Sequence, residues 1–134
     1  MTFDELILAA KSVLGARKIT DRGSHAMAGS VAAALLSESG NVYLGVCIEV
    51  CSGIGFCAEH AAIGTMVTAG ESKIVKAVAI HEAAGIIPPC GRCREFMSQI
   101  HKDNIDTEII IATDKTVTLR ELLPYRWDEA KDEA

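Results

Sequence analysis

Helix-like and strand-like segments alternate along this chain, and the alternation restricts the folds that it can adopt. Apolar residues recur at helical spacing after Thr2, which can cap a first helix together with Glu5 three residues later. The helices are expected over residues 2–15, 57–70 and 91–101, with a helical turn over 119–123, and the strands over 30–36, 42–50, 74–80, 108–113 and near Val117. Residues 18–29 and 85–89 contain glycine or proline and are expected to be loops. Strands that alternate with helices favour a layered α/β domain.

The strand expected over residues 42–50 would sort its side chains onto two faces. Successive side chains of a strand point to opposite sides, so valines, a leucine and an isoleucine occupy one face. Cys47 and Glu49 share the other face and should point the same way. Cys47 and Cys51 are expected to be small buried hydrophobic residues rather than metal ligands.

The other three cysteines stand near the starts of two predicted helices. Cys90 and Cys93 are three positions apart, so their sulfur atoms can share one helical face and bind one ion. A CxxC pair alone also fits a redox dithiol. Cys57, at the start of the other helix, adds a third thiolate and favours a metal. Three protein ligands with a fourth position open are typical of catalytic zinc sites, whereas structural sites have four ligands.

A carboxylate accompanies this cysteine set. Glu59 follows Cys57 by two positions, so the first helical turn can hold it beside the metal without making it a ligand. Zinc lowers the pKa of bound water toward about 7, and a nearby carboxylate can accept that proton and deliver it to a substrate. The pattern is therefore suited to adding water to an electrophilic carbon.

These motifs resemble those of the cytidine deaminase superfamily, and closely its cytidine deaminase and blasticidin S deaminase branch. The matching segments are Val31-Ala-Ala-Ala-Leu-Leu36, Gly45-Val-Cys-Ile-Glu49, Cys57-Ala-Glu59, Pro89-Cys-Gly-Arg-Cys-Arg94 and Glu121-Leu-Leu-Pro124. The resemblance implies a zinc ion held by Cys57, Cys90 and Cys93, with Glu59 as general acid and base. It further implies a three-layer α/β/α fold with a mixed five-stranded sheet and, commonly, a homotetramer whose active sites neighbouring subunits complete.

The reaction implied is hydrolytic removal of the C4 amino group from a small cytosine nucleoside, cytidine or deoxycytidine, with release of ammonia. Such an enzyme would act in pyrimidine salvage. The alternatives are a modified cytosine nucleoside such as blasticidin S, another aminated heterocycle, or a non-catalytic zinc-binding member of the fold.

The substrate contacts depart from the family's usual pattern. Cytidine deaminases similar to this chain have Asn and Glu on the second strand to hold the ribose, and here the pair is Cys47 and Glu49. Blasticidin S deaminases typically lack the glutamate. Where many relatives carry an aromatic residue that stacks on the base, this chain has Gly29. Phe56 and Ala58, which flank Cys57, are further candidate substrate contacts, although Phe56 fits the core equally well.

The charge of the site calls for compensation. Three thiolates and Zn²⁺ sum to −1, which opposes ionisation of a bound water. Many relatives carry Arg after the Cys-Ala-Glu motif, whereas this chain has His60, which we expect to be a structural helix residue. Arg92, inside the CxxC motif, is the better candidate for a hydrogen bond to a ligand thiolate. Arg94 and Arg120 are expected to be ion-paired surface residues.

Composition argues against a nucleic-acid substrate. The 134 residues carry a net charge of −5 and only 4% aromatic side chains, so neither a basic field nor stacking platforms are available for a polynucleotide. The N-terminal residues carry no export signal and no apolar run approaches a membrane span, so a cytoplasmic protein is expected. We expect one domain over residues 1–134 with a mobile tail over 127–134, where Trp127 either caps a neighbour's site or anchors the tail.

Overall fold

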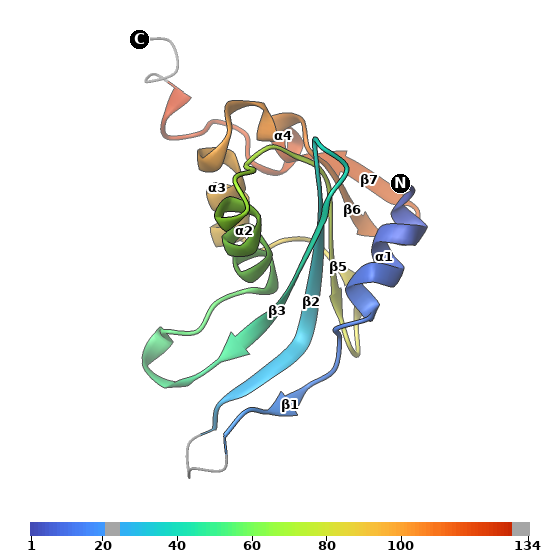
Figure 1. The fold of residues 1–134 in the computed structure, drawn as a ribbon. Coiled ribbons are helices and arrows are strands. Elements are labelled where there is room, and N and C mark those ends of the chain that lie inside the picture. Colours follow the sequence, from blue (N-terminus) through green and yellow to red (C-terminus); the bar gives the residue numbers. More distant parts are fainter. Residues whose placement is uncertain (21–24, 130–134) are drawn as a thin grey trace.

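A mixed β-sheet forms the middle layer of the molecule (Figure 1). The computed structural model describes residues 1–20 and 25–129; most of the expected tail and part of the expected 18–29 loop lie outside the described residues. The strands are β1 (Arg17–Lys18), β2 (Met27–Ser37), β3 (Val42–Glu49), β4 (Ile74–His81), β5 (Gly85–Ile87), β6 (Glu108–Ala112) and β7 (Lys115–Thr118).

Five of these strands are the five that the sequence predicts, and they lie in the order β3, β2, β4, β6, β7. β4 and β6 run parallel, whereas the other neighbouring pairs are antiparallel. The two additional strands are short. β1 pairs with Met27 and Ala28 of β2, and β5 pairs with the last residues of β4. Lys18 of β1, residues 27–29 of β2 and the whole of β5 fall where loops were expected. The pairing of β1 and β5 depends on the ends of long neighbouring strands and leaves no alternation of its own in the sequence.

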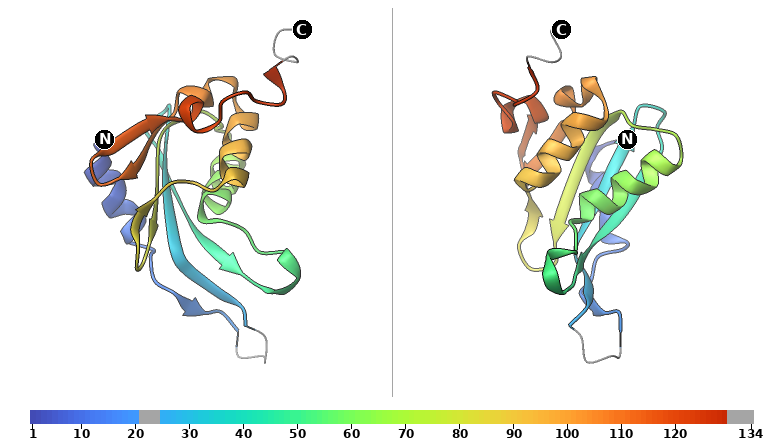
Figure 2. Two further views of the ribbon diagram at one scale, coloured as in Figure 1. Left: turned by 180° about the vertical axis from the view of Figure 1, so that it is seen from behind. Right: turned by 90° about the vertical axis from the view of Figure 1, so that its left-hand side faces the viewer.

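Helices cover both faces of the sheet, as the predicted three-layer architecture requires (Figure 2). α1 (Phe3–Lys11) packs on one face, and α2 (Ala58–Thr68) and α3 (Gly91–Ile100) lie on the other. The capping box expected at Thr2 is present, with Glu5 closing it. The remaining helical segments are α4 (Leu119–Leu122) and two 3-10 turns over Cys51–Gly53 and Lys102–Asp106. No helix in the described part of the chain is both long and apolar enough to span a membrane.

Each face of the sheet has its own hydrophobic core. Alternate residues of β2 serve the two cores, since Ala34 and Leu36 pack on the α1 side while Leu35 packs on the α2 side. The α1 side includes the fully buried Leu6. Aliphatic side chains and alanines make up most of both cores.

Gly45 allows α2 to pack very closely against β3. A Cβ atom at this position would lie 2.4 Å from both the carbonyl oxygen of Ala58 and the backbone nitrogen of Ala62. No other residue type fits at such a separation. The strand thereby determines where the first turn of α2 lies, and that turn carries Cys57 and Glu59.

Gly29 in β2 is required by the path of the backbone. Its φ of +90° lies in the region that favours glycine, and a Cβ atom here would lie 2.2 Å from the carbonyl oxygen of Gly15. An aromatic side chain at this place is therefore incompatible with the path of the chain after α1.

Candidate functional site

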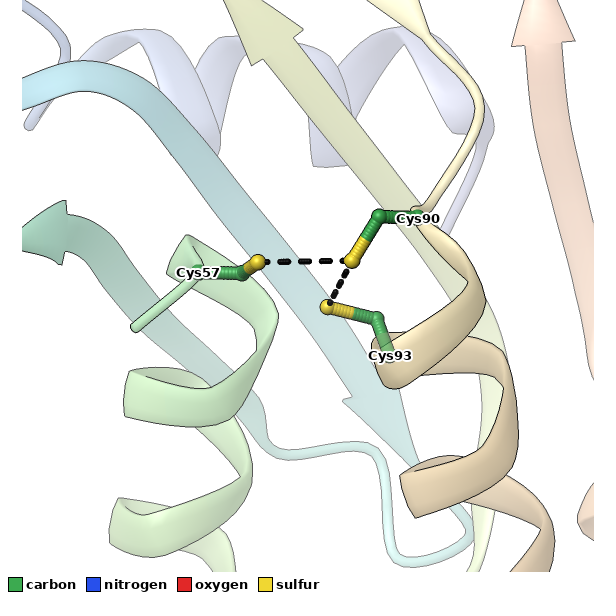
Figure 3. Close-up of side chains that lie close together, drawn as sticks. All are labelled: Cys57, Cys90 and Cys93. Atoms are coloured by element: carbon green, nitrogen blue, oxygen red, sulfur yellow. Dashed lines mark hydrogen bonds between the residues drawn. The ribbon is translucent and has the colours of Figure 1, made fainter. Parts of the chain in front are cut away.

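Three cysteine sulfur atoms meet where α2 and α3 begin (Figure 3). Cys57 and Cys90 are the N-cap residues of the two helices, and both have extended backbone angles. The Cys57 and Cys90 sulfur atoms lie 3.4 Å apart, and those of Cys90 and Cys93 lie 3.5 Å apart. Two helix N-termini thus bring their unpaired N–H groups toward one cluster of thiols, an arrangement that favours thiolates.

The donor set fits a zinc ion. The three sulfur atoms all lie within 4.8 Å of one another, which is close enough for one ion to contact all three. Thiolate ligands select zinc among the common divalent ions of a cell. Among the described residues, no fourth His, Cys, Asp or Glu side chain joins this cluster. The described residues therefore offer three sulfur donors to one ion.

The environment of the sulfur atoms affects their ionisation. Burial raises the pKa of the Cys57 thiol. Burial and the neighbouring charge of Glu59 raise the pKa of Cys93 far above its ordinary value. For Cys90 burial acts in the same direction, but hydrogen bonds led by the backbone N–H of Cys93 lower the pKa overall. A cation at the cluster would remove the obstacle to ionising all three.

Glu59 lies in the first turn of α2 and is almost fully buried beside the sulfur cluster. Burial raises the pKa of its carboxyl group, whereas hydrogen bonds to the Glu59 backbone and to Cys93 lower it to a smaller extent. A buried carboxyl group that shares a pocket with a cluster of potential metal ligands is well suited to moving protons.

A pocket of about 420 Å³ opens onto the cluster and Glu59. Its volume lies in the range of small-molecule sites, about 300–1,000 Å³. The candidate substrate contacts of the sequence all line it, and the full lining is Val31, Cys47, Ile48, Glu49, Gly55, Phe56, Cys57, Ala58, Glu59, Ile87, Pro88, Cys90 and Arg92. Phe56 pairs with Ile48 through two backbone hydrogen bonds of 3.0 Å, which bring its ring to the pocket rather than into the core.

Glu49 and Cys47 point the same way, as the alternation of β3 predicts, and a serine joins them. The Ser30 hydroxyl lies 3.0 Å from Glu49 Oε1 and 3.2 Å from Cys47 Sγ. Cys47 also accepts a hydrogen bond from the backbone N–H of Val31. Sequence reasoning missed Ser30, whose signal was a single polar residue at the start of an alanine-rich strand.

The expectations for Cys51 and Arg94 are wrong. Cys47 is buried as expected, but Cys51 is exposed because it starts a 3-10 turn outside the sheet. Arg120 forms the expected surface ion pair with Asp106. Arg94 instead donates hydrogen bonds to the carbonyl oxygens of Pro89 and Leu122, and so fixes the turn that leads into Cys90. The sequence gives no sign of this role of Arg94, because the CxxC spacing does not show which backbone carbonyl groups lie near the side chain.

The two side chains considered for charge compensation, Arg92 and His60, differ in their contact with the sulfur atoms. Arg92 is exposed at the edge of the pocket, and among the described residues no hydrogen bond joins its guanidinium group to a sulfur atom. His60 Nδ1, by contrast, lies 3.3 Å from Cys93 Sγ. Sequence reasoning assigned His60 only a structural role, although its position one turn after Cys57 was a signal.

Trp127 follows α4 and is exposed.

Comparison with known proteins finds deaminases that are similar to this chain. It is 32% identical over 99 residues to a cytidine deaminase of Halalkalibacterium halodurans, a match that covers 70% of this chain and 74% of the relative. It is 31% identical over 108 residues to a blasticidin-S deaminase of Bacillus cereus, covering 72% and 76%. No family model matches the chain.

Solved structures give the same fold. A cytidine deaminase from Burkholderia pseudomallei superposes with a TM-score of 0.75 at 28% identity, over 95% of this chain and 100% of the other. A cytidine deaminase from Mycobacterium tuberculosis superposes with a TM-score of 0.77 at 23% identity, over 95% and 98%.

Proposed function

Because the chain belongs to the cytidine deaminase superfamily, in the branch of the cytidine and blasticidin-S deaminases, we propose that it is a zinc-dependent hydrolase that deaminates a small cytosine nucleoside. Cytidine or deoxycytidine is the proposed substrate, and ammonia and the uracil nucleoside are the products. The observation that carries the proposal is the meeting of three cysteine sulfur atoms and a buried glutamate at one pocket.

Cys57, Cys90 and Cys93 would hold the zinc ion, and Glu59 would handle the protons. When bound, zinc supplies the Lewis acidity that makes water a nucleophile near neutral pH. Glu59 takes a proton from the attacking water and gives it to N3 of the ring as the water oxygen bonds to C4. Glu59 then carries the second proton to the C4 amino group, the C4–N bond breaks, and ammonia leaves.

The pocket walls would orient the nucleoside. Glu49 is the group that accepts hydrogen bonds from a sugar hydroxyl, and Ser30 holds its carboxylate at 3.0 Å. Phe56 offers an apolar face to the base and Ala58 leaves room beside it. Arg92 lies at the edge of the pocket, where its positive charge offsets part of the negative charge of three thiolates.

A modified cytosine nucleoside is the second candidate. The likeness to a blasticidin-S deaminase supports it, together with Cys47, which offers no amide group to a ribose.

A homotetramer in the cytoplasm is part of the proposal, and light scattering on the purified protein tests the oligomeric state.

The experiment that tests the proposal measures ammonia release from cytidine, deoxycytidine, cytosine and blasticidin S by the zinc-loaded protein. Turnover of cytidine or deoxycytidine is the expected result. Turnover of blasticidin S with the two natural nucleosides inert would replace the first candidate by the second. No ammonia from any of the four would contradict both.

A further inference from the structure

His60 and the sulfur atom that it contacts belong to different helices. It lies in the first turn of α2, and its Nδ1 atom is 3.3 Å from the sulfur of Cys93 on α3. Cys93 has no exposed surface, so no solvent water can solvate its sulfur. A buried thiolate without hydrogen-bond donors is costly, and each donor aimed at it lowers that cost.

The orientation of the His60 ring is fixed by α3. The imidazole packs against the ring of Phe96, with centroids 4.7 Å apart and planes tilted by 37°. Phe96 lies one turn after Cys93 on the same helix, so the element that supplies the ligand also holds the donor in place. Packing against Phe96 alone would not require a ring nitrogen, whereas a hydrogen bond to the Cys93 sulfur atom does.

A thiolate can only accept a hydrogen bond, and this requirement selects the tautomer of the imidazole. With Nδ1 protonated, His60 donates to Cys93 without carrying a charge of its own. Arg92 lies near the same ring, and a neutral imidazole avoids repulsion from its guanidinium group.

We propose that His60 is a positioning residue for the metal centre, whose Nδ1–H donates a hydrogen bond to the Cys93 thiolate and so strengthens zinc binding. The inference rests on the proposed function, because it requires zinc at the three cysteines. Arg92, expected from the sequence to make this contact, contributes charge from the edge of the pocket instead.

The test compares His60→Phe with His60→Asn in the zinc-loaded protein. Phenylalanine keeps a ring against Phe96 but donates nothing, whereas the asparagine amide can occupy the place of Nδ1. Competition with a chromogenic chelator should show zinc affinity about 10–100-fold weaker for His60→Phe, and His60→Asn should recover most of the loss. His25→Phe, a change at an exposed histidine, is the matched control and should equal the unaltered protein.

Cobalt substitution supplies a readout that simple packing would not move. Loss of a hydrogen bond to the thiolate should shift the sulfur-to-cobalt charge-transfer band to lower energy in His60→Phe but not in His60→Asn. If His60→Phe is not recovered folded, His60→Leu takes its place. Equal zinc affinity and an unshifted band in the donor-less variant would overturn the role of His60. Absence of zinc binding by the unaltered protein would overturn the proposed function instead.

Discussion

The sulfur atoms of Cys57 and Cys90 lie 3.4 Å apart although the two residues are 33 positions apart in the chain. Each residue is the N-cap of a helix, and both helices rest on the same face of the sheet. The strands β4 and β5 and the turn held by Arg94 connect the two helices. The cluster is therefore a product of the fold as a whole, and its integrity depends on how the two helices are seated.

Removal of one sulfur ligand should abolish tight zinc binding. Cys57→Ser is expected to weaken zinc affinity by more than the ~10–100-fold cost of losing a ligand's hydrogen-bond partner. Chelator competition and elemental analysis measure the change. Cys51→Ser is the matched control, since Cys51 is exposed and outside the cluster. Equal zinc content in the two variants would mean that Cys57 is not a ligand.

A methyl group at Gly45 should damage the site without touching it. Gly45→Ala forces a Cβ atom to within 2.4 Å of the α2 backbone, and overpacking of this kind costs about 1–3 kcal/mol in the free energy of unfolding. Movement of α2 should also lower activity, because the same turn carries Glu59.

Gly64→Ala on the same helix is the control for that change. A Cβ atom there meets nothing within 4 Å, and alanine favours a helix by about 0.5–1 kcal/mol over glycine. Denaturant titration should therefore show opposite signs for the two variants. A stabilising Gly45→Ala would refute the close approach of β3 and α2.

Glu49 should matter only for substrates that carry a sugar hydroxyl. Glu49→Gln replaces a charged acceptor, and hydrogen bonds to charged groups contribute about 1.5–3 kcal/mol. We expect kcat/KM for cytidine to fall roughly 10–100-fold, mostly through KM, with less effect of Ser30→Ala. Free cytosine lacks the sugar and serves as the internal control. An equal loss with cytosine would indicate that Glu49 supports the pocket rather than binding the sugar.

A carboxylate far from the site should make stability depend on pH in the acid range. Hydrogen bonds from Tyr43 and Asn41 lower the pKa of Glu71 from its ordinary value to about 2. A group whose pKa is depressed by folding stabilises the folded state above its unfolded pKa, and the benefit disappears as the pH falls through the folded value.

Thermal melting tests this expectation. The Tm difference between the unaltered protein and Glu71→Gln should be constant above about pH 5 and should shrink as the pH falls toward 2. Glu108→Gln, at an exposed position of β6, should follow the unaltered protein throughout. A Glu71→Gln difference that grows at low pH would have the wrong sign.

The sequence predicts the elements that have a periodicity of their own, and it misses those that depend on a neighbour. The capping box at Thr2 and the alternation that unites Cys47 with Glu49 are local patterns, and both are present. β5 has three residues and becomes a strand only because β4 extends far enough to pair with it. Its sequence before two prolines gives no strand signal.

The same division applies to the candidate site. The cysteine spacing and the position of Glu59 can be recognised in the sequence because these residues lie within the first turns of two helices that the sequence predicts. Ser30, His60 and Arg94 act through partners on other elements, at Glu49, Cys93 and Pro89 respectively. No pairwise spacing in the sequence encodes those contacts, since the sheet and the seating of α2 on β3 bring them about.

The most direct test of the central claim follows the conversion of cytidine to uridine by ultraviolet absorbance, with the zinc-loaded protein and with zinc-loaded Glu59→Gln. We expect about one zinc per chain in both proteins. Turnover should be lost by about 10²–10⁴-fold in the variant, because the general acid and base is absent. Full activity in Glu59→Gln with zinc retained would contradict the account.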